Sequence, residues 1–278
     1  MTAVPTAALV QMTAGIDPRD NAATLSSAIA RAAEGGAAMV FTPEMSNLVD
    51  RDRARAAASI VAEADDRALA AVREAAARHG IWVQLGSIAV RRDDGRFANR
   101  ALVIDADGEI RARYDKLHLF DVDLASGESW RESAVYAHGE AAVVVATPIG
   151  MLGLSVCYDL RFPALYAALS AAGATVLAVP SAFTRPTGAA HWQTLLCARA
   201  IENAAFVIAA AQTGQHEDGR VTHGHALAID PWGAVLSDAG EAPGVQFAKI
   251  DVARVADVRS RIPVLAHRRA IPTVTVIE

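Results

Sequence analysis

One short run of sequence predicts a junction between a strand and a helix, and this junction carries a cysteine. In GLSVCYDLRFP, apolar positions lead without a break up to Cys157, which predicts a buried strand over 153–156. Pro163 suits the first position of a helix, and the pattern after it predicts a helix that ends at Gly173. Cys157 is therefore expected at an elbow, where a thiol and the next backbone N–H can point the same way.

Strand and helix patterns alternate along much of the chain. Apolar runs bounded by turn residues predict strands, including one over 204–211, and an alanine-rich stretch predicts a long exposed helical region over 53–78. Hairpin turns interrupt the alternation, so a mixed α/β fold is predicted, in which each half can carry a sheet with helices on its outer face. No repeat or linker divides the sequence, and residues 1–278 are expected to form a single domain.

Composition restricts the class of protein. Hydrophobic residues make up 53% and charged residues 21%, and the net charge of −5 comes from interleaved acids and bases. This favours a folded protein and gives no basic patch for nucleic acid or membranes. The N-terminal segment is typical of a first strand rather than a signal peptide. Two cysteines, Cys157 and Cys197, are too few for a disulfide framework, so a reducing cytoplasmic setting is expected.

Three residues with reactive side chains follow predicted strands: Glu44, Lys116 and Cys157. Ligands in α/β proteins gather outside the carboxyl ends of strands, so these side chains are candidates for one site. Glu44 can take the thiol proton, and Lys116 with the Tyr158 N–H can face an oxyanion. Each residue also has an ordinary explanation: Cys157 as a small buried hydrophobe, Glu44 as a helix cap and Lys116 as an exposed loop residue.

Longer motifs place these residues in a family. TPEMSN, YDKLHLFD and GLSVCYDLRFP, in this order, resemble the three signature segments of the nitrilase (carbon–nitrogen hydrolase) superfamily. The likeness continues through PSAFTRPTGAAHWQTLLCARAIEN, AAAQTG, HGHALAIDPWG and IPVLAHRR. These segments resemble the Nit branch of the superfamily, which contains deaminated-glutathione amidase and omega-amidase. The resemblance implies a four-layer αββα sandwich and a triad of Glu44, Lys116 and Cys157 without a cofactor.

The resemblance also implies a second glutamate, which orients Lys116 and the substrate amide. Glu132, in WRES, aligns best with this position, and Glu128 is a close rival. Members of the superfamily typically pair through the helix after the nucleophile, so a homodimer or a larger homo-oligomer is expected.

Three further residues are candidates for substrate binding. Arg161 matches an arginine that holds the substrate carboxylate in related carbamoylases, and an ion pair with Asp159 or another acid is the alternative. Phe183 and Thr184 follow a predicted strand end and are expected, from position alone, to line the pocket. His223 and His225 would share one face of a strand, but no third ligand lies near them in sequence, so no metal site is predicted.

The implied reaction is hydrolysis of a carboxamide to an acid plus ammonia through a thioester on Cys157, with Glu44 serving in turn as base, acid and base. The expected substrate is a small anionic or peptide-like monoamide. Deaminated glutathione is the first choice, because PSAFTRPTGAAHW is closer to that subgroup. The alternatives are an omega-amidase acting on α-ketoglutaramate or α-ketosuccinamate, a nitrile hydrolase, and a catalytically idle binding protein of the same fold.

Overall fold

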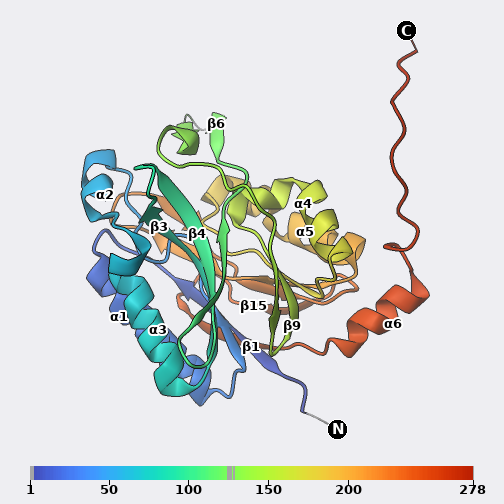
Figure 1. Cartoon of the computed structure of the whole chain (residues 1–278), viewed down its shortest axis with the longest axis horizontal. Helices are drawn as coiled ribbons and strands as arrows, with labels where there is room; N and C mark the ends of the chain where they lie inside the picture. The colour runs from blue at the N-terminus through green and yellow to red at the C-terminus, as the bar shows by residue number, and fades with distance from the viewer. Residues whose placement is uncertain (1–2, 124–126, 128, 278) are drawn as a thin grey trace.

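Two large β-sheets pack face to face between outer layers of helices (Figure 1). The structure, a computed structural model, describes residues 3–123, 127 and 129–277. Helices α1 (Pro18–Glu34) and α3 (Arg67–His79) cover the first sheet, and helices α4 (Pro163–Ala171) and α5 (Arg185–Asn203) cover the second. This arrangement confirms the αββα sandwich that the resemblance implies.

The first sheet has the strand order β13-β12-β1-β2-β3-β4-β5, with β16 paired to β1. Its strands are β1 (Thr6–Met12), β2 (Met39–Phe41), β3 (Trp82–Arg91), β4 (Phe97–Ile104), β5 (Ile110–Asp115), β12 (Ala211–Gln215), β13 (Val221–His223) and β16 (Gly244–Lys249). The second sheet has the order β15-β14-β11-β10-β9-β8. Its strands are β8 (Val144–Thr147), β9 (Gly150–Leu154), β10 (Val176–Ala178), β11 (Phe206–Ala209), β14 (Leu227–Ile229) and β15 (Val235–Asp238).

The first sheet is apolar on both faces because it is covered on both sides. Along β1, Ala7 and Leu9 belong to the apolar cluster between the two sheets, whereas Ala8 and Val10 belong to the cluster under α1 and α3. Successive side chains of a strand point to opposite faces, so a strand buried on both faces reads as an unbroken apolar run. The short apolar runs of the sequence are therefore the inner strands of the sandwich.

The expectation of one sheet for each half of the chain is wrong. Strands β12, β13 and β16, from the C-terminal half, belong to the first sheet. The chain passes from the second sheet to the first at Ala210, between β11 and β12. Because buried apolar residues continue across this point, the sequence pattern over 204–211 predicts a single strand. At the crossing the Ser181 N–H donates to the Ala210 carbonyl (2.9 Å), which fastens the loop after β10.

The helical region expected over 53–78 is interrupted and only partly exposed. Helix α2 (Arg53–Ser59) is capped by Asp52, and α3 is capped by Asp66, whose carboxylate accepts from the Leu69 N–H at 2.8 Å. Between them the chain is largely extended, with only the short 3-10 helix η1 (Glu63–Asp65). The two caps end the alanine-rich pattern as separate helices, and α3 buries one face against the sheet.

The last helix, α6 (Ala253–Arg261), is followed by a segment that extends away from the body of the molecule (Figure 1). Ile271 and Val274 in this segment are 85% and 77% exposed. None of the helices in the described residues is long and apolar enough to cross a membrane.

Candidate active site

Three strand ends bring the predicted triad into one cavity. Glu44 follows β2, Lys116 follows β5 and Cys157 follows β9, so the first sheet supplies two of the side chains and the second sheet supplies the third. All three line a cavity of about 340 Å³. Their exposed fractions are 4%, 2% and 8%, which means that the side chains are largely shielded from bulk water.

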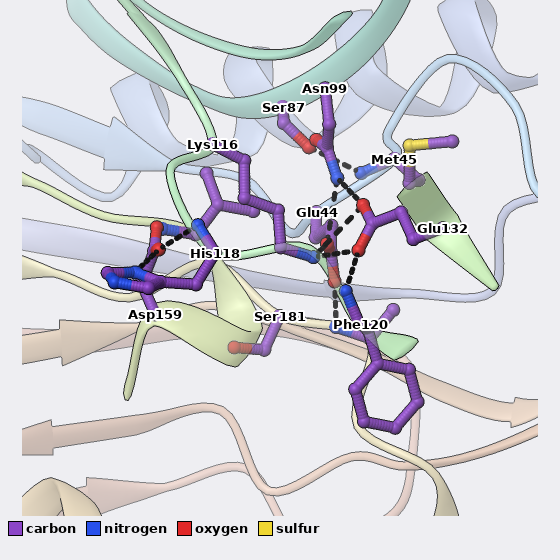
Figure 2. A network of polar contacts seen from close by, with 12 residues as sticks. Glu44, Met45, Ser87, Asn99, Lys116, His118, Phe120, Glu132, Asp159 and Ser181 are labelled. Carbon is purple, nitrogen blue, oxygen red and sulfur yellow. Dashed lines mark hydrogen bonds and ion pairs between the residues drawn. The ribbon is translucent and has the colours of Figure 1, made fainter. Parts of the chain in front are cut away.

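The Lys116 ammonium lies between two carboxylates (Figure 2). Its Nζ is 2.9 Å from Glu44 Oε1, 2.8 Å from Glu132 Oε2 and 3.1 Å from Glu132 Oε1. Burial alone would lower the pKa of Lys116, but the charges of Glu132 and Glu44 raise it well above its ordinary value. Lys116 is therefore a fixed positive charge inside the cavity.

The second glutamate of the site is Glu132, at the start of the 3-10 helix η2 (Glu132–Ala134). It follows the two-stranded hairpin of β6 (Asp121–Asp123) and β7 (Ser129–Arg131). The Phe120 N–H donates to Glu132 Oε2 at 2.6 Å, which holds the carboxylate against Lys116. Glu128, its rival in the sequence, lies outside the described residues.

Asn99 is a member of this network that the sequence analysis missed. Its Nδ2 donates to Glu44 Oε1 (3.0 Å) and to Glu132 Oε1 (3.1 Å), and its backbone carbonyl accepts from the Lys116 N–H (2.9 Å). Asn99 is 2% exposed and lies in β4. An asparagine inside a mostly apolar strand was the available signal, because a buried amide needs polar partners.

Glu44 is held in place by both sheets. The Ala182 N–H, from the loop after β10, donates to Glu44 Oε2 at 2.9 Å. Burial would raise the pKa of this carboxyl, but the charge of Lys116 and hydrogen bonds from Cys157, Lys116 and Asn99 outweigh burial and bring the pKa below its ordinary value. Glu44 is thus an ionised carboxylate beside the Cys157 thiol.

Cys157 occupies the predicted elbow, in a backbone conformation that is uncommon for residues other than glycine. Its φ is +51°, in the left-handed region, and its N–H donates to the Pro180 carbonyl at 2.9 Å. Burial and the negative charge of Glu44 raise the pKa of the thiol well above its ordinary value. At neutral pH the group beside Glu44 is therefore a thiol rather than a thiolate.

The elbow differs from the prediction in one respect. Strand β9 ends at Leu154, and the 3-10 helix η3 (Cys157–Arg161) separates the cysteine from α4. The Tyr158 N–H, the predicted oxyanion donor, has no acceptor among the described residues. It is therefore a free donor directly after the thiol-bearing residue.

Asp159 braces the elbow and does not pair with Arg161. Its Oδ1 lies 2.7 Å from His118 Nδ1, and its Oδ2 accepts from the Tyr114 hydroxyl (2.7 Å) and the Val156 N–H (2.8 Å). Asp159 is fully buried, so its carboxylate is already committed to three neighbours. The Arg161–Asp159 ion pair weighed as an alternative is absent, and His118 supports the loop after Lys116.

Arg161, Phe183 and Thr184 all line the cavity. The Arg161 guanidinium lies over the rings of Tyr158 (6.0 Å) and Phe183 (5.5 Å). Its nitrogens are 3.3 Å from His191 Nδ1, and no carboxylate of the described residues lies within 4.0 Å of them. The charge of Arg161 is therefore available to an anion in the cavity.

The cavity is rich in cations although the chain is acidic overall. Among the described residues that line it, six side chains are basic and three are acidic, whereas the net charge of the chain is −5. The basic residues are Arg51, Arg53, Lys116, Arg131, Arg161 and Arg220. Such a lining favours a negatively charged ligand.

The histidine pair His223 and His225 and the second cysteine, Cys197, lie outside the cavity. The rings of His223 and His225 stack with centroids 4.7 Å apart, and His225 Nδ1 lies 3.0 Å from Asp238. The described part of the chain contains no group of three or more residues placed to hold a metal ion. Cys197 lies on α5 and packs against the core.

Comparison with known proteins agrees with this arrangement. The model of the carbon-nitrogen hydrolase family matches residues 6–260. Deaminated glutathione amidase of Yersinia enterocolitica is 41% identical over 265 residues, which cover 94% of this chain and 92% of the relative.

Two solved structures extend the comparison. The crystal structure of the C. elegans NitFhit protein has a TM-score of 0.89 and 40% identity, and the match covers 97% of this chain and 66% of that protein. An amidase from Nesterenkonia sp. AN1, with acrylamide added at its active-site cysteine, has a TM-score of 0.78 and 29% identity over 93% of this chain and 98% of that chain. By the span of the family match and the identity of its relatives, the chain belongs to the carbon–nitrogen hydrolase family and is a hydrolase of non-peptide carbon–nitrogen bonds.

Proposed function

We propose that this chain is an amidase that cleaves an anionic amide through a thioester on Cys157. The observation that supports it is the Lys116 ammonium, held between Glu44 and Glu132 in a cation-rich cavity that Cys157 also lines. A thiol beside an ionised carboxylate and a fixed cation has both the base and the anion stabiliser that nucleophilic attack requires.

The proposed steps follow from the contacts. Glu44 takes the Cys157 proton as the sulfur attacks the amide carbon, and Lys116 with the free Tyr158 N–H stabilises the oxyanion. Glu44 then gives its proton to the departing amine, and the acyl group remains on sulfur. A water molecule then attacks the thioester and gives its proton to Glu44, and Glu44 returns this proton to the departing sulfur, so that the acid, the thiol and the Glu44 carboxylate are formed. Each oxyanion donor is expected to contribute about 3–4 kcal/mol to this chemistry.

The rate should depend little on pH near neutrality. Glu44 is already ionised at its lowered pKa and Cys157 is a thiol at its raised pKa, so neither group titrates between about pH 6 and 8. We expect kcat/KM to be flat over that range and to fall on the acid side only as Glu44 gains a proton, below its ordinary pKa of 4.5. Initial rates from pH 4 to 9 with one substrate test this. A tenfold rise of kcat/KM per pH unit through neutrality would instead indicate attack by a free thiolate.

We propose deaminated glutathione as the substrate. Curated relatives that are about 40% identical carry the name deaminated glutathione amidase, and the cationic cavity suits a molecule with two carboxylates. Deaminated glutathione contains no primary carboxamide: its acyl group is bonded to the nitrogen of cysteinylglycine. Hydrolysis therefore releases this dipeptide, and the ammonia expected from the sequence would come only from monoamides such as α-ketoglutaramate.

The two candidate substrates share one acyl product. Deaminated glutathione and α-ketoglutaramate both yield 2-oxoglutarate, so a single assay of that product compares them directly. We expect a higher kcat/KM for deaminated glutathione. A clear preference for α-ketoglutaramate would assign the chain as an omega-amidase, and 2-oxoglutarate from neither would remove the proposed substrate.

We further propose that Arg161 binds the carboxylate of the 2-oxo acid end of the substrate. Its guanidinium lies in the cavity next to Tyr158 and has no carboxylate partner among the described residues.

Cys157 and Cys197 are both free thiols, which supports a reducing compartment such as the cytoplasm.

We propose a homodimer that forms through α4, the helix after the cysteine. Its exposed face carries Ala164, Ala168 and Ala171, small residues that allow another helix to approach closely. The apolar side chains of the C-terminal segment, including Ile271, are exposed in one copy and would be buried against a second copy.

Sedimentation velocity should give about twice the 29.1 kDa mass of one chain, and Ala168→Arg should shift the measured mass toward that of a single chain. A 29.1 kDa species at micromolar concentration would contradict the proposal.

A further inference from the structure

A tryptophan and two arginines form a second polar region of the cavity. The Arg220 guanidinium lies 4.7 Å from the centre of the Trp130 ring, and the Arg51 guanidinium lies 5.9 Å from it. All three side chains line the same cavity as Cys157. We refer to Arg51, Trp130 and Arg220 as the tryptophan–arginine cluster.

Two hydrogen-bond donors in this cluster have no partner among the described residues. They are Trp130 Nε1 and Arg220 Nε, and both atoms are buried. A buried donor without an acceptor costs about 1–3 kcal/mol, so such groups are expected to meet a ligand or water. Both donors belong to side chains that line the cavity, which makes a bound acceptor group the natural partner.

The cluster also keeps a positive charge. Arg220 Nη2 is 3.2 Å from Asp218 Oδ2, and this carboxylate offsets the positive charge of Arg220. Arg51 has no carboxylate within 4.0 Å among the described residues. One uncompensated arginine together with two free N–H donors matches the needs of a carboxylate.

A row of aromatic rings connects the cluster to the reacting centre. Trp130 contacts Phe120 with ring centroids 6.2 Å apart, and Phe120 contacts Tyr158 at 5.0 Å. Tyr158 is the residue after Cys157, and Arg161 lies over its ring at 6.0 Å. The cavity thus has Arg161 over the ring of the residue that follows Cys157, and a separate cationic cluster further along the aromatic row.

We propose that the tryptophan–arginine cluster binds the terminal carboxylate of the leaving amine. This inference rests on the proposed function, because it assigns one end of the amide to Arg161 and the other end to the cluster. α-Ketoglutaramate and deaminated glutathione deliver the same acyl group, so only the leaving side of the cavity can tell them apart. The cluster is therefore the specificity determinant for amides whose leaving group is a dipeptide with a free terminal carboxylate.

The test uses the full chain with Arg51→Gln, since Arg51 is exposed and its replacement leaves the core untouched. We expect kcat/KM for deaminated glutathione to fall about tenfold, while kcat/KM for α-ketoglutaramate stays within about twofold. Arg111→Gln, an exposed arginine outside the cavity, is the matched control and should change neither value. Trp130→Phe keeps a ring and removes the free N–H, and it should show the same selective loss.

Two further measurements separate this inference from the proposed function. Deaminated glutathione with its glycine carboxylate converted to an amide should be a tenfold poorer substrate for the wild type but should lose nothing more in Arg51→Gln. Cysteinylglycine should inhibit α-ketoglutaramate hydrolysis by the wild type more strongly than by Arg51→Gln. Equal losses on both substrates, or equal inhibition of both proteins, would overturn the cluster assignment even if deaminated glutathione is hydrolysed. A wild type that fails on deaminated glutathione but shows the inhibition difference would remove the proposed substrate alone.

Discussion

Replacing Lys116 with methionine is expected to abolish amide hydrolysis and to destabilise the fold in the same step. The substitution keeps an unbranched side chain of similar length but removes the charge that Glu44 and Glu132 share. Two buried carboxylates are then left facing each other without a cation. Breaking a buried ion pair by removing one partner typically costs about 3–5 kcal/mol. The oxyanion also loses a donor, so kcat should fall by at least about 10²–10³.

Thermal unfolding and 2-oxoglutarate release measure the two effects separately. The chain contains only two lysines, and Lys249 is exposed, with its Nζ 2.8 Å from Thr6 Oγ1. Lys249→Met is therefore a matched control that should keep both stability and activity. Adding Glu132→Gln to Lys116→Met should recover part of the stability and none of the activity. A Lys116→Met protein with the wild-type Tm would show that the carboxylates do not depend on the lysine.

The sequence predicted the triad because each member follows a predicted strand. Glu44 and Cys157 follow buried apolar runs and Lys116 follows the partly exposed strand β5, and strand ends of two packed sheets can meet at one place. Their convergence could not be deduced, because Lys116 depends on β5, at the edge of the first sheet, and Cys157 depends on the second sheet. The likeness of the motifs to a known superfamily supplied that step.

Other parts of the site depend on contacts between segments that are distant in sequence. Asn99 lies within a strand, and only the folded structure shows that its amide reaches both glutamates. Asp159 was a plausible partner of Arg161 because they lie two residues apart, but its carboxylate is taken by Tyr114, His118 and the elbow backbone. Local sequence patterns give the strands and the caps, whereas the partners of a buried polar group come from tertiary packing.

Replacing Cys157 with alanine should remove activity while leaving the fold intact. We propose that this sulfur carries the acyl group, so its loss closes the thioester route, and kcat should fall on the order of 10⁴-fold or more. Alanine fits the space, and the positive φ is held by the Cys157 N–H bond to Pro180, which the substitution keeps. The free energy of unfolding should change by no more than about 1 kcal/mol.

The measurement combines kinetics with intact mass after mixing with substrate. The wild type should gain the mass of the acyl group during turnover, and Cys157→Ala should not. Cys197→Ala is the control, because Cys197 lies on α5 outside the cavity and should affect neither readout. A Cys157→Ala protein that keeps more than about one hundredth of the wild-type rate would exclude Cys157 as the nucleophile. Glu44 and Lys116 would then have to act on a water molecule that attacks the amide directly, and the thioester would not form.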